Sequence, residues 1–229
     1  MTQTEHLPQP TSTVEDYLLL IYSMHREGED VIAARLKERK GVSAPTAWAT
    51  LRRMERDGLV NLGKGHKIEL SPQGLELAES IMRRHMLAER LLTDILKLDW
   101  ADVHEEAHRM EHAISPLVEK QILALLDNPT TCPHGNPIPG APHEPKESIQ
   151  PLRHVSQGDL VTINNIAEHA EDDAELMHYL ERSGLTPGAR LRIEEVANAN
   201  GTITVALLND SERQVVVGLT TADLVLVHD

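Results

Sequence analysis

Seven prolines between Asn128 and Pro151 divide the sequence into two parts of different periodicity. Proline lacks the backbone N–H that a helix needs and restricts the residue before it, so a helix is not expected to cross this segment. Before the segment, apolar residues recur at helical spacing, whereas runs such as TITVALL (202–208) and QVVVGL (214–219) after it are typical of short strands. The sequence therefore predicts a mainly helical N-terminal part and a small all-β C-terminal part joined by an extended linker.

Composition narrows the classes of protein that this chain can represent. The single cysteine, Cys132, excludes an intrachain disulfide and is typical of a reducing compartment. No apolar run is long enough to cross a membrane and no signal peptide opens the chain, so we expect a cytoplasmic protein without a membrane partner.

The distribution of charge qualifies the net value of −14, which taken alone argues against a nucleic-acid partner. Residues 31–75 carry nine Lys or Arg against four Asp or Glu, whereas residues 141–229 carry six against fifteen. The overall average therefore conceals a basic segment in the N-terminal part.

The order of elements in the N-terminal part is that of a winged helix-turn-helix. A capping box at Ser12–Glu15 predicts a first helix that reaches about His25. A short helix is expected over residues 31–40, and a third begins with Ser43 as N-cap. Two strand-like runs follow around the turn Gly63–His66. The third helix would then enter a DNA major groove.

Residues of this third helix and of the wing are candidates for DNA contact. Hydroxyls near the start of the helix can reach base edges or phosphates, and basic side chains can neutralise the backbone. The alternative is a basic amphipathic helix that packs on the core without contacting DNA. For Trp48 we favour a position in the core over a contact with the edge of a sugar. The candidate DNA-binding residues are Ser43, Pro45, Thr46, Thr50, Arg52, Arg53, Lys64 and Lys67.

A long helix is predicted from Pro72 onward, and its apolar residues cover more than one stripe, which favours burial against a second subunit. Asp99 could cap the next helix, which we expect to continue past Pro116 to about Leu126. This helix contains VHEEAHRMEH, residues 103–112.

Within that stretch, four candidate metal ligands, His104, His108, Glu111 and His112, fall within roughly 100° of one helix face. Solvated surface residues are the alternative, but a divalent cation would satisfy converging imidazoles and carboxylate together. His85 and Glu89 form a second pair at i, i+4 on the preceding helix, either an ordinary ion pair or part of a second metal site. His104 to His108 also matches the H-E-x-x-H pattern of zinc hydrolases, with Glu105 as the base.

Longer motifs give a resemblance to a known family. RRHMLAERLLTDILKLDWADVHEEAHRMEH, together with RRMERDGLV and GNPIPG, closely resembles the three-domain repressors of the diphtheria toxin repressor family, which sense iron or manganese. The match is strong over residues 12–140 and weak beyond. It implies a winged-helix domain at 1–74, a helical dimerisation and metal-binding domain at 75–140, a Pro-rich linker at 141–151 and an SH3-like, FeoA-like domain at 152–229.

The resemblance also implies two metal sites per chain and no catalytic residues or small-molecule substrate. Because the equivalents of His104 and His108 bind different metals in the family, the H-E-x-x-H match would be accidental and Glu105 would have no required role. The implied primary ligands are Asp16, His108, Glu111 and His112, and the implied ancillary ligands are His85, Glu89, His104, Asp172 and Glu175.

Departures from the family pattern bear on the metal. Iron-responsive members typically have Met and Cys at the positions of Asp16 and His108, and small manganese sensors place acids at the positions of His108 and Leu19. The resulting oxygen and imidazole set suits Mn²⁺, which we favour, or Fe²⁺, while Zn²⁺, Co²⁺ and Cd²⁺ can substitute in vitro. Met86 stands where the family often has an anion-binding Arg.

The expected function is that of a homodimeric, metal-dependent repressor that binds palindromic double-stranded operators and controls metal-homeostasis genes. Two alternatives stay open at the level of sequence. One is an H-E-x-x-H zinc hydrolase, and the other is a metal-storage protein without affinity for DNA; the basic segment weighs against both.

Overall fold

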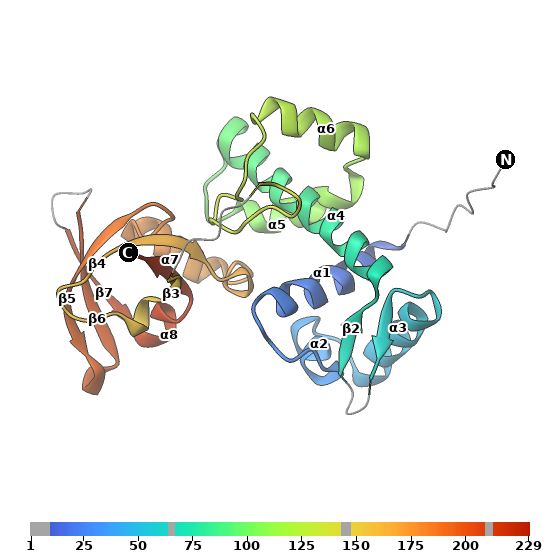
Figure 1. Ribbon diagram of the computed structural model, residues 1–229, viewed down its shortest axis with the longest axis horizontal. Helices are drawn as coiled ribbons and strands as arrows, with labels where there is room; N and C mark the ends of the chain where they lie inside the picture. The colour runs from blue at the N-terminus through green and yellow to red at the C-terminus, as the bar shows by residue number, and fades with distance from the viewer. Residues whose placement is uncertain (1–9, 64–66, 143–147, 209–212) are drawn as a thin grey trace. The chain divides into compact units, whose positions relative to one another are not determined.

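A computed structural model describes residues 10–63, 67–142, 148–208 and 213–229 (Figure 1). The chain divides into two compact units, residues 1–82 and 83–229. In the described part of the chain, no helix is both long and apolar enough to cross a bilayer.

The first unit has the helix, helix, helix, hairpin order that the sequence predicts for a winged helix-turn-helix (Figure 1). Its hairpin is antiparallel, with Val60 opposite Leu70. Fully buried side chains from the helices and from the second strand, among them Leu36, Leu51 and Ile68, make the core. The elements are α1 (Ser12–Arg26), α2 (Ala33–Arg39), α3 (Ala44–Arg56), β1 (Val60–Leu62), β2 (Ile68–Leu70) and the first half of α4 (Pro72–Arg90).

The starts of α1 and α3 differ in how they are capped. Ser43 Oγ accepts a hydrogen bond from the Thr46 N–H at 3.4 Å, and Pro45 occupies the first turn, as predicted. The predicted capping box of α1 is wrong, because Ser12 is already helical and Thr11, the residue before it, makes no side-chain cap bond. Of these two helices, only α3 has the side-chain cap that the sequence predicts.

In the second unit the predicted long helix after Asp99 is broken in two. Asp99 does not cap it; Asp102 precedes the first piece, without a side-chain cap bond. The chain is extended at Ile114 and Ser115, since a residue before proline avoids the helical region, and Ser115 then caps a new helix. The helical elements are the end of α4, a π-helical turn (Leu91–Ile95), α5 (Val103–Met110), a 3₁₀ turn (Glu111–Ala113) and α6 (Pro116–Leu125).

The prolines after α6 form a strap, defined here as residues 128–142, that contains no helix, as predicted. The strap docks on the C-terminal sheet: the Ile166 N–H donates to His134 O at 2.9 Å, and Asn136 Nδ2 donates to Ile166 O at 2.9 Å. Gly135 has φ +88°, and a Cβ there would lie 2.2 Å from the Asn164 carbonyl oxygen. Only glycine therefore fits where the strap meets the sheet.

The C-terminal part is an antiparallel six-stranded sheet in the order β3-β8-β4-β5-β6-β7, which confirms the predicted all-β class (Figure 1). Alternation is clear in β7, where Val215 and Val217 are buried and Val216 is exposed. Ala101, from the loop before α5, packs into the core of this sheet. The elements are β3 (Gln150–Pro151), β4 (Leu160–Ile166), α7 (Ala174–Ser183), β5 (Arg190–Ala197), β6 (Thr202–Leu207), β7 (Arg213–Gly218), α8 (Leu219–Ala222) and β8 (Val225–His228).

We predict that Gly135→Ala destabilises the second unit more than a positive φ alone explains. The matched control is Gly158→Ala, because Gly158 has φ +93° but open space around its would-be Cβ. The control is expected to lose about 1–3 kcal/mol of unfolding free energy, and Gly135→Ala more, since its Cβ also collides with backbone. Chemical denaturation of the full chain measures both; equal losses would contradict a tightly docked strap.

Candidate metal centre

A buried cluster of imidazoles and carboxylates draws on α4, α5 and the loop before α7. His85 and Glu89 lie one turn apart on α4, and their exposed fractions are 2% and 0%. Glu89 Oε1 lies 3.1 Å from His85 Nε2 and 3.0 Å from His104 Nδ1. His104 Nδ1 is also 3.1 Å from Glu171 Oε2. Side chains far apart in sequence thus direct their donor atoms to one point.

A second group of donors adjoins the first at the end of α5. The 3₁₀ turn that follows α5 carries Glu111, whose side chain is fully buried. Glu111 Oε2 lies 2.6 Å from His85 Nδ1 and 3.4 Å from His108 Nδ1, and Glu111 Oε1 lies 3.5 Å from His112 Nε2. The two nitrogens of His85 therefore face different carboxylates and join the two groups.

The strap adds donors that the sequence reasoning missed. His134 Nδ1 lies 3.2 Å from Glu171 Oε2 and 3.4 Å from Glu89 Oε1. Cys132 is buried and belongs, with Glu89 and His134, to a group of possible ligand atoms within 4.8 Å of one another. The available signal was the Cys-x-His spacing inside a proline-rich segment, and for Glu171 the acidic run that contains it.

Several hydrogen bonds orient these donors. The Trp100 carbonyl oxygen lies 3.2 Å from His134 Nε2, which can donate to it and so direct the Nδ1 lone pair toward the carboxylates. Asn136 Nδ2 donates to Glu171 Oε1 at 2.7 Å, and Asn165 Nδ2 donates to Asn136 Oδ1 at 2.8 Å. Residues of the strap and of β4 thereby help to orient His134 and Glu171.

The ionisation of the cluster reflects burial opposed by close charges. Burial disfavours the imidazolium of His85, but the charge of Glu89 and hydrogen bonds to Glu111 and Glu89 raise its pKa to about 9. Burial also disfavours the Glu111 carboxylate, yet hydrogen bonds from His108 and His85 lower its pKa to about 2. Burial, reinforced by Glu89 and Glu171, raises the pKa of Cys132 to about 12. Without a cation, the cluster therefore retains protons on imidazoles beside ionised carboxylates.

One buried carboxylate oxygen tests whether this cluster fits a cation. Within the described part of the cluster, Glu89 Oε2 is buried without a hydrogen-bond partner. An unsatisfied buried carboxylate oxygen is costly, by roughly 1–3 kcal/mol or more for a charged group. A divalent cation can be coordinated by carboxylate oxygens and imidazole nitrogens together, so this set of ligand atoms suits a divalent cation.

The other predicted metal ligands are placed as follows. Asp16 lies on α1 of the first unit, with Oδ2 3.3 Å from Lys40 Nζ. Asp172 is mostly exposed, with Oδ1 3.3 Å from His104 Nε2, and Glu175 is exposed in the first turn of α7. Glu171 is the carboxylate that the structure buries beside His104. Glu105 is 78% exposed and paired with Arg109, so it does not stand in the cluster as a hydrolytic base would.

The candidate DNA-contact residues lie on α3 and the wing of the first unit. Pro45, Thr46 and Arg52 are exposed, whereas Thr50 and Arg53 are partly buried. Lys67 is 57% exposed beside Glu69. Ser43 is the cap of α3, and Lys64 lies outside the described residues.

Comparison with known proteins places these features in a family. Residues 10–66 match the iron dependent repressor N-terminal DNA binding domain, residues 71–140 match the iron dependent repressor metal binding and dimerisation domain, and residues 150–229 match the FeoA domain. The chain is 38% identical over 203 residues to the iron-dependent repressor IdeR of Mycobacterium tuberculosis, covering 84% of this chain and 88% of that one. The chain belongs to the iron-dependent repressor family. It is accordingly a metal-responsive, DNA-binding transcriptional repressor and not an enzyme.

Further relatives support this membership of the iron-dependent repressor family. The diphtheria toxin repressor of Corynebacterium efficiens is 38% identical over 201 residues, 84% of this chain and 86% of that one. A solved manganese-dependent transcriptional repressor in complex with manganese is 32% identical, with a TM-score of 0.84 over 93% of this chain and 98% of that one. The manganese regulator SloR is 28% identical, with a TM-score of 0.74 over 94% of this chain and 98% of that one. The resemblance and the fold class predicted from sequence are confirmed.

We predict that cation binding to the cluster releases protons. Because the pKa of His85 is raised from 6.5 to about 9, the stabilisation by its proton is complete below pH 6.5 and is lost as the pH rises through 9. A cation competes with that proton. For each proton displaced, the affinity for Mn²⁺ should therefore rise by up to about tenfold per pH unit between pH 6.5 and 9.

Anaerobic calorimetric titration in two buffers of different ionisation enthalpy counts the protons released. His178→Ala is the matched control, since His178 pairs with Asp102 outside the buried cluster and its loss should leave the count unchanged. Binding without proton release at pH 7 would contradict the assignment of the cluster as the ligand set.

Proposed function

We propose that this repressor is activated by Mn²⁺ and, as a homodimer, then binds palindromic operators of metal-homeostasis genes. The observation that carries the proposal is the buried donor set of His85, Glu89, His104 and Glu171, which includes a carboxylate oxygen without a hydrogen-bond partner. Since the ligand is chromosomal DNA, the proposed place of action is the cytoplasm.

The choice of Mn²⁺ rests on the types of donor atom. Carboxylate oxygens and imidazole nitrogens suit Mn²⁺ and Fe²⁺, and no thioether stands at position 16, where Asp16 offers oxygen. One solved relative at 32% identity is a manganese-dependent repressor in complex with manganese. Cys132, a softer donor at the edge of the cluster, supports Fe²⁺ as the second candidate and Zn²⁺, Co²⁺ or Cd²⁺ as substitutes in vitro.

We propose two metal sites per chain. The proposed primary ligands are Asp16, His108, Glu111 and His112. This assignment rests on the family resemblance and, for the last three residues, on the contacts of Glu111 with both histidines. The ancillary ligands are His85, Glu89 and His104, completed by Glu171 or its neighbour Asp172, which both lie within 3.3 Å of His104. Asp172 and Glu175 are both exposed, but among the contacts described only Asp172 reaches His104, which makes Glu175 the weaker candidate.

The proposed dimer forms through the helical domain. In α6, Leu117, Val118 and Leu125 are 71%, 45% and 60% exposed, which is unusual for large apolar side chains on one short helix. These residues lie in the segment that matches the metal binding and dimerisation domain. The domain boundaries that we propose are 1–74, 75–140, 141–151 and 152–229.

The proposed coupling between metal and DNA runs through Asp16. Its carboxylate belongs to α1 of the DNA-binding domain, whereas the other primary ligands belong to the dimerisation domain. A cation bound by both would restrict how the two recognition helices of a dimer are presented to successive major grooves. A coupling of about 1–3 kcal/mol, typical of allosteric proteins, would suffice for a 5- to 150-fold response.

We predict that Asp16→Ala abolishes most of the Mn²⁺ response while leaving the weak metal-free binding to DNA unchanged. The probe is the tightest duplex recovered from random-sequence DNA by the wild-type protein with Mn²⁺. With 1 mM Mn²⁺ or with chelator, fluorescence anisotropy should show at least about a tenfold metal effect for the wild type and less than about twofold for the variant.

The matched control is Glu105→Gln, because Glu105 is exposed on α5 and pairs only with Arg109 among the contacts described. It should respond to Mn²⁺ like the wild type. A full metal response of Asp16→Ala would overturn the proposed coupling.

A further inference from the structure

The N-terminal half of α3 lacks the side chains that usually read bases. Residues 44–50 are Ala, Pro, Thr, Ala, Trp, Ala and Thr, without an amide or a charged group. Bidentate hydrogen bonds to guanine or adenine need Arg, Lys, Asn or Gln, so this half of the helix cannot supply them. Sequence reading by these two turns must therefore rely on hydroxyls or on apolar contact.

The hydroxyls in these turns already have local partners. Ser43 Oγ and Thr46 Oγ1 lie 2.8 Å apart, and Thr50 Oγ1 donates to Thr46 O at 3.2 Å. Such local bonds compete with bonds to a base edge. Apolar contact is consequently the main means of discrimination left to this part of α3.

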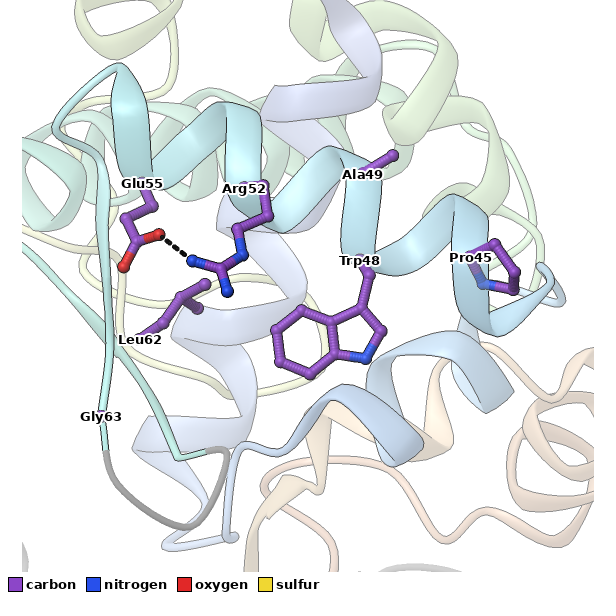
Figure 2. A pocket seen from close by; sticks show the side chains of 7 residues that line it. All are labelled: Pro45, Trp48, Ala49, Arg52, Glu55, Leu62 and Gly63. Atoms are coloured by element: carbon purple, nitrogen blue, oxygen red, sulfur yellow. Dashed lines mark hydrogen bonds and ion pairs between the residues drawn. The ribbon is translucent and has the colours of Figure 1, made fainter.

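Trp48 is the largest apolar group on this part of α3, and it does not lie in the core. The buried positions of α3 are Ala47, Leu51 and Met54, whereas Trp48 is only partly buried. The sequence-based preference for a core position is therefore wrong. Trp48 instead lines an open groove of about 610 Å³ between α3 and β1, together with Pro45 and Leu62 (Figure 2).

Trp48 has a cationic neighbour on the same helix. Arg52 Cζ lies 6.0 Å from the centroid of the Trp48 ring, and Arg52 Nη1 donates to Glu55 Oε2 at 3.0 Å (Figure 2). The guanidinium thus lies near the ring and is paired with a carboxylate one turn further along the helix. The Trp48 ring itself lines the groove.

We propose that Trp48 is a specificity-determining residue that recognises thymine through its 5-methyl group in the major groove. Thymine presents this methyl group there, cytosine lacks it, and apolar side chains distinguish the two by contact. Besides the charged pair Arg52 and Glu55, the groove is lined by the apolar side chains of Pro45, Ala49 and Leu62, and the indole has only one N–H donor to offer a phosphate. Apolar contact is therefore the main interaction that the Trp48 ring can make there. The proposal rests on the proposed function, in which α3 enters the major groove; family membership places the DNA-binding domain at residues 10–66.

The test is a double-mutant cycle between Trp48 and the thymine methyl. The probe is the duplex selected from random-sequence DNA by wild-type protein with Mn²⁺, and each thymine is replaced in turn by deoxyuridine, which removes only the methyl group. At one thymine of each half-site, deoxyuridine should weaken the wild type by roughly three- to tenfold. Trp48→Ala should lose a similar factor on the thymine duplex and be indifferent to deoxyuridine at that position.

Controls separate this contact from damage to the fold or to metal sensing. Ala44→Gly, at an exposed position of α3 that does not line the groove, should retain the wild-type response to deoxyuridine. Circular dichroism and the Mn²⁺ response should be unchanged in Trp48→Ala. Equal sensitivity of wild type and Trp48→Ala to deoxyuridine at every position would overturn the proposal while leaving metal-dependent binding intact. Failure of the wild type to select any duplex would instead overturn the proposed function.

Discussion

Glu89 is the constraint on which the second unit depends. It is a carboxylate with no exposed surface, and its pKa lies well below the usual value because the charges of His134 and His85 outweigh the effect of burial. One of its oxygens is shared by three imidazoles from α4, α5 and the strap, while the other has no hydrogen-bond partner among the described residues. A buried charge of this kind is tolerated only where it is paired or bound to a cation.

Several unusual features of the fold follow from bringing donors to Glu89. The proline-rich strap carries His134 to the cluster and is fixed there by Gly135, whose position against β4 leaves no room for a side chain. The loop between β4 and α7 contributes Glu171, which Asn136 of the strap orients. The FeoA-like part is therefore integrated with the helical part through polar contacts and through Ala101, and is not merely appended to it.

Local sequence rules predicted the helices, the hairpin and the class of the C-terminal sheet, because hydrophobic period and turn residues determine them. These rules failed where contacts between distant parts of the chain determine the local structure. The i, i+4 spacing placed His85 beside Glu89 correctly, but a one-face reading treated residues 104–112 as one helix, whereas the chain leaves the α-helix after Met110. Cys132, His134 and Glu171 were missed because no local period joins a proline-rich strap and an acidic loop to a helix.

The same distinction applies to the DNA-binding unit. The cap at Ser43 and the position of Pro45 follow from local rules, and both were predicted. The environment of Trp48 depends on the wing strand across the groove, which helical periodicity does not report. The identity of the metal is harder to predict than the ligands, since Mn²⁺ and Fe²⁺ prefer overlapping sets of ligand atoms.

Anomalous diffraction from crystals of the full chain grown with Mn²⁺, recorded on both sides of the manganese absorption edge, tests the central claim most directly. The account predicts an anomalous peak in contact with the carboxylate of Glu89 and the imidazole of His104. The account would be contradicted if the protein binds DNA in response to Mn²⁺ but its crystals show no anomalous peak within reach of Glu89.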